Sequence, residues 1–317
     1  MPKQVSYILK RVVYSLITIF VLIAVTFILM HLIPGDPFVG AKAIPPETKA
    51  AMNAKYGLDK PLFTQFILYV ANIFHGDFGI SLADKRPVAD VIGQAFPVSL
   101  DLGIRSLIFA FVIGLLLGIV AAVHRGKAGD TIAMLVALIG VSVPSFIIGA
   151  LLQYFLGLKL FEATGMCVFA IMGWDSVNAK ILPALALAFG SMATISRLMR
   201  TSMLDVLGQD YIKTAKAKGL SRSQIIWRHS VRNAIMPVVT VMGPLVAAVL
   251  TGAFVVENIF TIPGLGKYFV SCVQTNDYTM ISGTTMFYGA FLVFANLIVD
   301  IIYCLIDPRV KLTGGKE

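Results

Sequence analysis

The residues of this sequence that could carry out chemistry are few, and their spacing matches no catalytic or metal-binding pattern. The four histidines form no His-Glu-x-x-His pair, so a zinc protease would lack its ligands; they are His31, His75, His124 and His229. No Gly-x-Ser-x-Gly turn offers a serine nucleophile. The cysteines Cys167, Cys272 and Cys304 show no Cys-x-x-Cys spacing. We therefore expect no catalytic residue, no metal site and no cofactor bound by this chain.

Two short matches to nucleotide-binding motifs fail on their context. Asp77-Phe78-Gly79 has the letters of the magnesium-binding triplet of protein kinases, but no glycine-rich loop or catalytic loop accompanies it. The run from Gly264 to Lys267 lacks the spacing of a phosphate-binding loop and the Ser or Thr that follows its lysine. The sequence thus predicts a protein that makes and breaks no covalent bond.

The composition indicates a protein that is mostly surrounded by lipid. Of its 317 residues, 57% are hydrophobic and 14% are charged, whereas soluble domains carry about a quarter charged residues. We expect an all-α, polytopic integral membrane protein. The net charge of +9 could also suggest nucleic acid, but in a membrane protein the position of the charges matters more than their sum.

Six apolar segments are long enough to cross a bilayer, which takes about 20 residues. They run from Val12 to Ile33 and over residues 99–123, 130–157, 181–204, 234–257 and 280–306. A secretory signal peptide would have an apolar core of only about 7–15 residues, so we expect the first segment to be a retained helix.

Glycines and prolines inside these spans predict close packing and bending. Gly114 and Gly118 form a GxxxG pair that permits close approach of another helix. Pro144, Gly243 and Pro244 are candidate hinges, since neighbouring helices in a bundle can satisfy the carbonyls that a proline frees.

Charged residues within the spans have competing explanations. Arg105 follows Asp101 by four residues, which favours a local ion pair over a functional site. Asn296 and Asp300 in the last span could face a polar pathway or pack between helices, and the sequence does not separate the two.

Residues 34–97 are expected to form a small helical segment outside the membrane. Pro45-Pro46 followed by Glu47 predicts a helix start, and Pro61 opens an amphipathic piece that is too short to cross. A third short helix is expected after Pro87. We favour a helical cap over a separate site.

The distribution of positive charge predicts the orientation. With the N-terminus inside, 16 Lys and Arg residues fall in cytoplasmic segments, while the two short outer loops hold only Lys159, Lys180 and Lys267. This places 1–33 as a cytoplasmic N-terminus and first span, 98–306 as a five-helix core, 205–233 as a cytoplasmic hairpin, and 307–317 as a cytoplasmic tail. Cys167 and Cys272 could pair if both lie outside, but we favour free thiols.

The stretch from Asp210 to Pro237, which contains most of this hairpin, is a basic island between two apolar segments. It is expected to form two short helices that join at Gly219, with Ser221 and Gln224 as a capping box for the second helix. Its spacing also fits a DNA-binding helix-turn-helix. We favour a membrane-protein element over a nucleic-acid binder, because only about 30 residues separate the flanking spans and the positive-inside rule already explains the charge.

The hairpin resembles the EAA loop of ABC importer permeases. Lys213-Thr214-Ala215 stands at the Glu-Ala-Ala positions, followed by Gly219 and later by Ile235-Met236-Pro237. The lysine in place of glutamate means that no salt bridge of that glutamate can be carried over. That lysine and the distance of 18 residues from Gly219 to Pro237 are features of the peptide/nickel branch of this family.

Further stretches resemble the same branch over nearly the whole chain. They are LKRVVYSL, HLIPGDP, YGLDKPLFTQF, HGDFGISL, RPVADVI, DYIKTAKAKGLS, RHSVRNAIMPVVT, VENIFTIPGLG and LIDPRVKL. The chain therefore resembles the first of two paired permeases of an oligopeptide or dipeptide importer, a type I fold with six spans.

The resemblance implies a set of partners and no chemistry in this chain. They would be a homologous second permease, two cytoplasmic ATP-binding subunits that hold ATP and Mg²⁺, an external solute-binding protein and a peptide substrate, all in the plasma membrane of a bacterium or archaeon. Nickel, a metal chelate, an antimicrobial peptide or a sugar remain alternative substrates, because the binding protein largely sets specificity.

The resemblance also assigns roles within the hairpin. The residues that couple to the ATPases would be Asp210, Tyr211, Lys213, Thr214, Ala215, Ala217, Lys218, Gly219, Leu220 and Ser221. Those at the junction with the next span would be Arg228, Arg232, Asn233 and Pro237. Ala215, Ala217 and Gly219 would permit close approach to the partner, while Trp227 is expected to pack against the chain's own spans.

Overall fold

The computed structural model describes residues 3–32, 59–81 and 83–306, and within these ranges the chain is helical and forms no strand. The expected all-α fold is therefore confirmed. The helix start predicted at Pro45-Pro46 lies outside the described residues.

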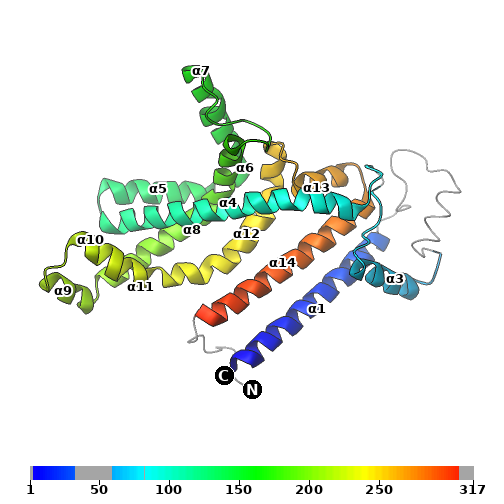
Figure 1. Cartoon of the computed structure of the whole chain (residues 1–317), viewed down its shortest axis with the longest axis horizontal. Helices are drawn as coiled ribbons and strands as arrows, with labels where there is room; N and C mark the ends of the chain where they lie inside the picture. Colours follow the sequence, from blue (N-terminus) through cyan, green and yellow to red (C-terminus); the bar gives the residue numbers. More distant parts are fainter. Residues whose placement is uncertain (1–2, 33–58, 82, 307–317) are drawn as a thin grey trace. The chain divides into compact units, whose positions relative to one another are not determined.

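The helices follow one another along the chain with short connections (Figure 1). Their bounds are α1 Lys3–Leu32, α3 Leu62–Phe74, α4 Val88–Val123, α5 Ala128–Ser142, α6 Ser145–Leu152, η1 Gln153–Lys159, α7 Leu160–Thr164, α8 Val177–Leu207, α9 Asp210–Ala217, α10 Arg222–Gln224, η2 Ile225–Val231, α11 Arg232–Ala234, α12 Met236–Ile259, α13 Leu265–Gln274 and α14 Tyr278–Ile306. The elements η1 and η2 are π-helical turns.

Two compact units divide the chain. The terminal unit contains the residues up to Val98 together with those from Gly264 onward, and the central unit is Ser99–Pro263. Helix α4 contributes its first turns to the terminal unit and the remainder to the central unit.

In the terminal unit, α1 packs along α14, and α3 packs against α1. The ring of Phe66 on α3 contacts Phe27 of α1 edge to face, with centroids 5.3 Å apart. Asp300 of α14 forms an ion pair with Arg11 of α1 at 3.1 Å. Asp300 therefore contributes to packing between these two helices, the second of the two explanations offered by the sequence.

A buried aspartate fastens the loop that precedes α4. Asp277 is 2% exposed, accepts hydrogen bonds from the Ser81 hydroxyl and the Ala83 amide, and accepts another from the Met280 amide at the start of α14. The loop from Asp77 to Pro87, in which the kinase-like triplet lies, is thus a structural element of this unit.

In the central unit, α8 is the most deeply buried helix and packs against α5, α6 and α12. The predicted role of the GxxxG pair is confirmed: a Cβ on Gly114 would stand 2.8 Å from the Met192 carbonyl, and one on Gly118 would stand 2.6 Å from the Ser196 carbonyl. Only glycine allows α4 to lie this close to α8.

Five helices are long and apolar enough to cross a membrane, and the residues from Arg222 to Leu250 make a sixth if their bent pair of helices counts as one span. These counts cover the part of the chain that the structure describes. The expected multi-pass architecture is therefore confirmed, while two of the predicted elements differ in the structure.

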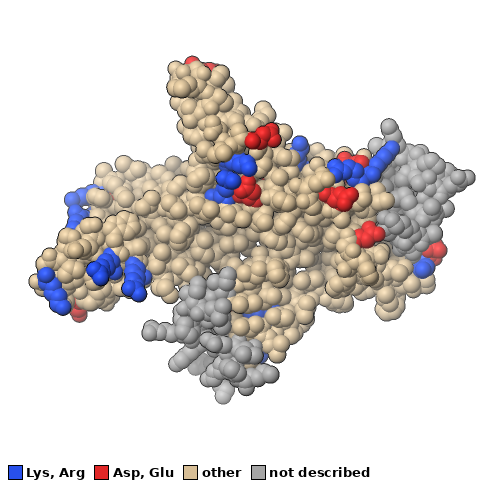
Figure 2. All heavy atoms as spheres, in the orientation of Figure 1, with Lys and Arg blue, Asp and Glu red and all other residues tan. Residues whose placement is uncertain are grey.

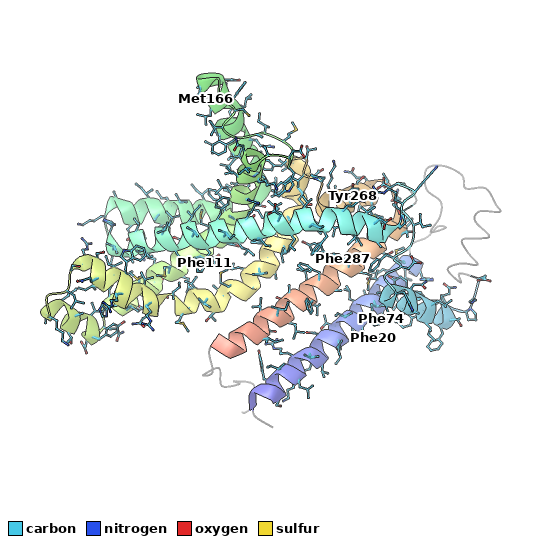
Figure 3. All side chains as sticks on the ribbon, viewed as in Figure 1. Phe20, Phe74, Phe111, Met166, Tyr268 and Phe287 are labelled. Atoms are coloured by element: carbon cyan, nitrogen blue, oxygen red, sulfur yellow. The ribbon has the colours of Figure 1, made fainter. Side chains whose placement is uncertain are left out.

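The first correction concerns the span expected over 130–157, which is two helices. Val143 is extended (φ −100°, ψ 125°), because the ring of Pro144 disfavours helical backbone in the residue before it. Helix α5 ends at Ser142, and α6 starts at Ser145 and continues through η1 and α7. Figure 3 shows Met166 at the tip of the arm that α6 to α7 form.

The second correction concerns the short helix expected after Pro87. It is not separate, because α4 runs without interruption for 36 residues from Val88 and includes Pro97. A helix of this length is about 54 Å long, well beyond the roughly 30 Å of hydrocarbon in a bilayer. Its first turns can therefore lie outside the membrane, where water can satisfy the Gly93 carbonyl that Pro97 leaves without a donor.

Charge is unevenly distributed over the central unit. Figure 2 shows lysine and arginine side chains gathered at the end formed by α9 and α10, whereas the visible faces of α4 and α5 are mostly uncharged. The basic residues of this stretch are Lys213, Lys216, Lys218, Arg222, Arg228 and Arg232.

Candidate functional site

The hairpin over 205–233 has the predicted form of two helices around a glycine turn. Gly219 follows α9 with φ +76°, a left-handed conformation that glycine adopts without strain. Ser221 then caps α10: its hydroxyl accepts a hydrogen bond from the Gln224 amide at 3.3 Å, and its own amide donates to Gln224 Oε1 at 2.9 Å. The capping box is confirmed.

The second arm continues from α10 into the wider turn η2. Within it the Ser230 hydroxyl donates to the Ile225 carbonyl at 2.9 Å, and Ser230 is fully buried. The sequence predicted a second helix after the cap at Ser221 but not this π-helical turn, which rotates the following residues relative to a regular helix.

A small apolar core joins the two arms. Ile212 and Ala215 of α9 and Ile225 of η2 are buried against one another, and Leu220 packs onto them. Ala215 is 7% exposed, so its small side chain lets the two arms approach each other. Ala215 thus lies in the core of the hairpin, and its predicted role in coupling stays a prediction.

The outer surface of the hairpin is polar and basic. The coupling residues that face outward are Asp210, Tyr211, Lys213, Thr214, Ala217, Lys218, Gly219 and Ser221. Lys213 forms an ion pair with Asp210 at 2.9 Å, and both side chains are well exposed.

Trp227 departs from its expected environment. We predicted that it packs against the chain's own spans, but its side chain is 54% exposed. The prediction was wrong because the π-helical turn directs Ile225 and Ile226 inward, toward the hairpin core and the bundle. Trp227 therefore remains available as a large amphipathic surface group.

One hydrogen bond joins the predicted coupling and junction residues. Asn233 donates from Nδ2 to the Tyr211 hydroxyl at 2.9 Å and to the His229 carbonyl at 3.0 Å. Arg228 and Arg232 are exposed on the same arm. Pro237 lies in the first turn of α12, directly after a 50° bend between Arg222–Ala234 and Met236–Leu250.

The three candidate hinge residues lie in different settings. Pro144 stands in the break between α5 and α6, whereas Gly243 and Pro244 lie inside α12, which continues as one helix through both. The marked bend near the hairpin falls several residues earlier, at Ile235.

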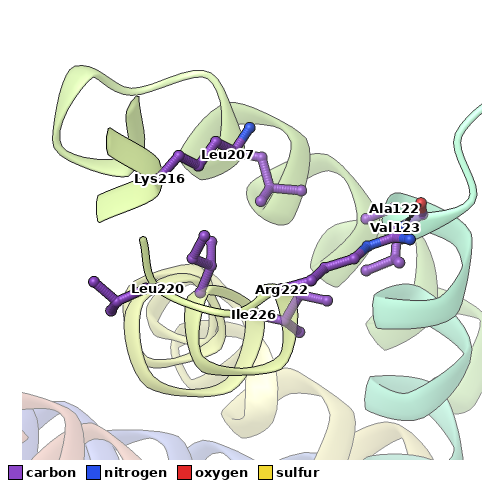
Figure 4. Close-up of a pocket in the computed structure, with 8 residues that line it drawn as sticks. Ala122, Val123, Leu207, Lys216, Leu220, Arg222 and Ile226 are labelled. Carbon is purple, nitrogen blue, oxygen red and sulfur yellow. Dashed lines mark hydrogen bonds between the residues drawn. The ribbon is translucent and has the colours of Figure 1, made fainter. Parts of the chain in front are cut away.

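A cavity of about 460 Å³ separates the hairpin from the end of α4 (Figure 4). Apolar side chains of both elements line it, with Lys216 and Arg222 at its edge. Arg222 crosses to α4 and donates from Nη2 to the Val123 carbonyl at 3.1 Å. This contact satisfies a carbonyl at a helix C-terminus, where cations are favoured.

Sequence reasoning missed an ion pair between α5 and α8. Arg200 donates to Asp130 through Nε at 2.6 Å and through Nη2 at 2.8 Å, and the Asp130 side chain is 10% exposed. The sequence could have indicated this pair, because Asp130 and Arg200 lie inside or beside apolar spans, where a charged residue usually pairs with another charged residue.

At the other end of α8, the predicted pair of Asp101 and Arg105 is confirmed at 2.8 Å. Lys180 was not predicted to join it, yet it lies 3.1 Å from the other carboxylate oxygen and over the ring of Trp174. The cluster therefore ties α4 to α8.

The cysteines Cys167 and Cys272 are free thiols, the first exposed and the second buried. Burial, with a smaller effect of the Asp277 charge, raises the pKa of the Cys272 thiol to about 12. Among the residues that the structure describes, no three His, Cys, Asp or Glu side chains are grouped closely enough to hold a metal ion.

Comparisons with known proteins agree on one family. Residues 114–312 match the model described as binding-protein-dependent transport system inner membrane component, and residues 4–103 match the model for its N-terminal region. The dipeptide transport system permease protein DppB of Bacillus subtilis is 46% identical over 311 residues, 96% of this chain and 98% of that protein.

Two further matches extend this result. The oligopeptide transport system permease protein OppB of Haemophilus influenzae is 40% identical over 312 residues, 97% of this chain and 100% of that protein. Among solved structures, a chain of the inward-facing MetNI methionine ABC transporter matches with a TM-score of 0.56 at 16% identity, covering 68% of this chain and 96% of that chain. This structural likeness supports the fold alone.

Proposed function

The chain belongs to the family of binding-protein-dependent transport system inner membrane components, and from this membership we propose that it is a permease subunit of an ATP-driven importer of dipeptides or oligopeptides. The observation that carries the proposal is the nearly full-length similarity to two proteins whose names state dipeptide and oligopeptide transport. The spans would form the pathway, and this chain would carry out no reaction itself.

The proposed complex contains a second, homologous permease, two cytoplasmic ATP-binding subunits and an external solute-binding protein. ATP and Mg²⁺ would be held by the ATP-binding subunits. The orientation rests on the 16 Lys and Arg residues assigned to the cytoplasmic side, with both chain ends and the hairpin inside.

The hairpin is the proposed contact with the ATP-binding subunits. It is a rigid unit, because its two arms share the core of Ile212, Ala215 and Ile225. Its two ends lead directly into α8 and α12, so a displacement of the hairpin would be transmitted to both spans. Tyr211, Ala217 and Trp227 offer exposed surface for a groove, and the surrounding lysines would favour an acidic rim.

The test of the function is uptake by the purified complex in proteoliposomes. With the binding protein outside and ATP inside, labelled di- and tripeptides should accumulate, and a mixture without ATP should give none. Accumulation of nickel, a metal chelate or a sugar in place of peptides would overturn the substrate assignment. Absence of any ATP-dependent uptake would overturn the proposed function.

The test of the contact is a substitution on the exposed surface of α9. Ala217→Asp adds a charge to an exposed position without touching the hairpin core, and Ser223→Asp on α10 adds the same charge as a control. We expect Ala217→Asp to abolish uptake and binding-protein-stimulated ATP hydrolysis while the protein still inserts and assembles. Equal uptake by both variants would contradict the assigned surface.

A further inference from the structure

The helices α4, α5 and α8 form a closely packed block, in which the backbones of α4 and α5 each lie against the backbone of α8. A Cβ on Gly140 of α5 would stand 2.7 Å from the Phe189 carbonyl of α8, and Gly114 and Gly118 of α4 meet the next turns of the same helix. Successive turns of α8, from Phe189 to Met199, are thus contacted first by α5 and then by α4. Such close contacts leave little room for the three helices to slide.

The ion pair of Asp130 and Arg200 lies at the end of this block. Arg200 stands one residue beyond Met199 and seven residues before α8 ends at Leu207, inside the first turn of the 205–233 hairpin. Its two donors meet both carboxylate oxygens, at 2.6 and 2.8 Å, and the Gly126 amide donates to the same carboxylate at 3.0 Å. The pair therefore fixes α8 to the turn between α4 and α5.

The same turn is fastened to the hairpin on its other side. Arg222 of α10 donates to the carbonyl of Val123, the last residue of α4, across the edge of the 460 Å³ cavity. The α4–α5 turn thus has one charged contact with α8 and one with the hairpin. Beside the cavity, Ala122 of α4, Leu207 of α8 and Ile226 of η2 belong to one apolar core, and apolar contacts alone specify no direction. The two polar contacts add directional links to this apolar packing.

We propose that Asp130 and Arg200 are positioning residues for energy coupling: their ion pair makes the α4–α5 turn move with the end of α8, so that displacement of the hairpin reaches α4 and α5 as well as its own two spans. The bidentate geometry supports this, because it fixes direction as well as distance. A pair with little exposure also keeps its strength better than a solvated one, since little water screens it. The inference rests on the proposed function in one respect, namely that the hairpin is displaced by ATP-binding subunits.

The experiment compares four variants in the purified importer complex. Asp130→Asn and Arg200→Gln each remove one charge, the double variant removes both, and Arg200→Lys keeps the charge but loses the planar pair of nitrogens that meets both carboxylate oxygens. Glu162→Gln is the matched control, since Glu162 forms an ion pair with Lys159 at 2.7 Å in which both side chains are half exposed. Assembly, basal and stimulated ATP hydrolysis, and peptide uptake are measured for each.

The expected result is a loss of coupling and not a loss of the complex. Peptide taken up per ATP hydrolysed should fall by about five- to tenfold in Asp130→Asn, the lower part of the usual range of coupling between sites. The double variant should be no worse than either single one, because residues of one pair are not additive. Glu162→Gln should retain the ratio of the unsubstituted complex.

Three outcomes would overturn the inference. The first is an unchanged ratio of uptake to hydrolysis in assembled Asp130→Asn and Arg200→Gln. The second is additive losses in the double variant. The third is failure of every variant, including Arg200→Lys, to assemble, which would make the pair a folding requirement only. If the unsubstituted complex transports no peptide, the proposed function fails instead, and this control separates the two cases.

Discussion

At the scale of single residues, the turn of the hairpin requires glycine because of its backbone conformation, and not because neighbouring atoms leave no room for a side chain. Gly219 has φ +76°, and a Cβ there would meet nothing within 4 Å. Gly93 in α4 is equally open but carries no such constraint. A comparison of substitutions at Gly219 and Gly93 therefore measures the effect of the backbone conformation alone, since neither position is sterically crowded.

Gly219→Ala should destabilise the hairpin by about 1–2 kcal/mol, the usual cost of a left-handed conformation in a residue with a Cβ. Gly93→Ala should instead add about 0.5–1 kcal/mol of stability, because alanine loses less entropy than glycine in a helix. Hydrogen exchange of the amides over 210–231 should accelerate in the first variant and stay unchanged in the second. Equal exchange in both variants would show that the turn carries no strain.

The two described cysteine side chains should differ sharply in reactivity. Thiols react as thiolates, and the pKa of Cys272 is raised to about 12, so this thiol stays protonated and unreactive at pH 7 to 9. Cys167 is exposed and accessible to reagents. In a Cys304→Ser background, we expect maleimide to modify one thiol per chain at pH 8, lost in Cys167→Ser and retained in Cys272→Ser.

At the scale of elements, the packing of α4 on α8 determines whether a glycine at the interface can be replaced by a residue with a Cβ. A Cβ on Gly118 would lie 2.6 Å from the Ser196 carbonyl and 2.7 Å from Met199 Cβ, so backbone would have to move. Gly190 of α8 lies in the same block, yet its nearest neighbour would be 3.6 Å away, an ordinary contact. Replacing glycine by alanine should therefore cause a steric clash at position 118 but not at position 190.

Gly118→Ala should destabilise the complex by about 1–3 kcal/mol, as expected for overpacking of a tight interface. Gly190→Ala should change its stability by far less. Thermal unfolding of the detergent-solubilised complex measures the difference. A Gly118 variant as stable as the Gly190 variant would show that α4 and α8 can separate without cost.

Local features of these elements could be predicted from sequence, and long-range partners could not. Gly219, Ser221 and Gln224 lie within a few residues of one another, so their turn and cap follow from local geometry. The pairs Asp130–Arg200 and Asp101–Lys180 join residues 70 and 79 positions apart. Such pairs require knowing which helices are neighbours, and the helical pattern alone leaves this open. The two wrong span bounds arose at Pro144 and Pro97, where one proline broke a helix and the other did not.

At the scale of the whole molecule, charge distribution is the argument for topology. The hairpin concentrates basic residues, whereas the short segments assigned outside carry only Lys159, Lys180 and Lys267. Within the described residues, Ser145–Thr164 is long and apolar enough to cross without α5. If the bent pair at Ile235 also counts as one span, the crossings number six, and an even number would place both chain ends on the same side.

This topology predicts which residues an impermeant reagent can reach in intact cells. Cys167 follows the α6–α7 arm and is exposed, so a membrane-impermeant maleimide should label it from outside. Ser223 lies on the exposed part of α10, so the Ser223→Cys variant in a Cys167→Ser background should be labelled only after permeabilisation. The opposite pattern would invert the protein in the membrane and remove the hairpin from the side where ATP is available. Labelling of both sites from outside would mean an even number of crossings between them, instead of the single crossing that α8 provides. Since α8 is the one long span between residues 167 and 223, that result would contradict the assignment of α8 as a crossing, and with it the route by which the hairpin acts on the bundle.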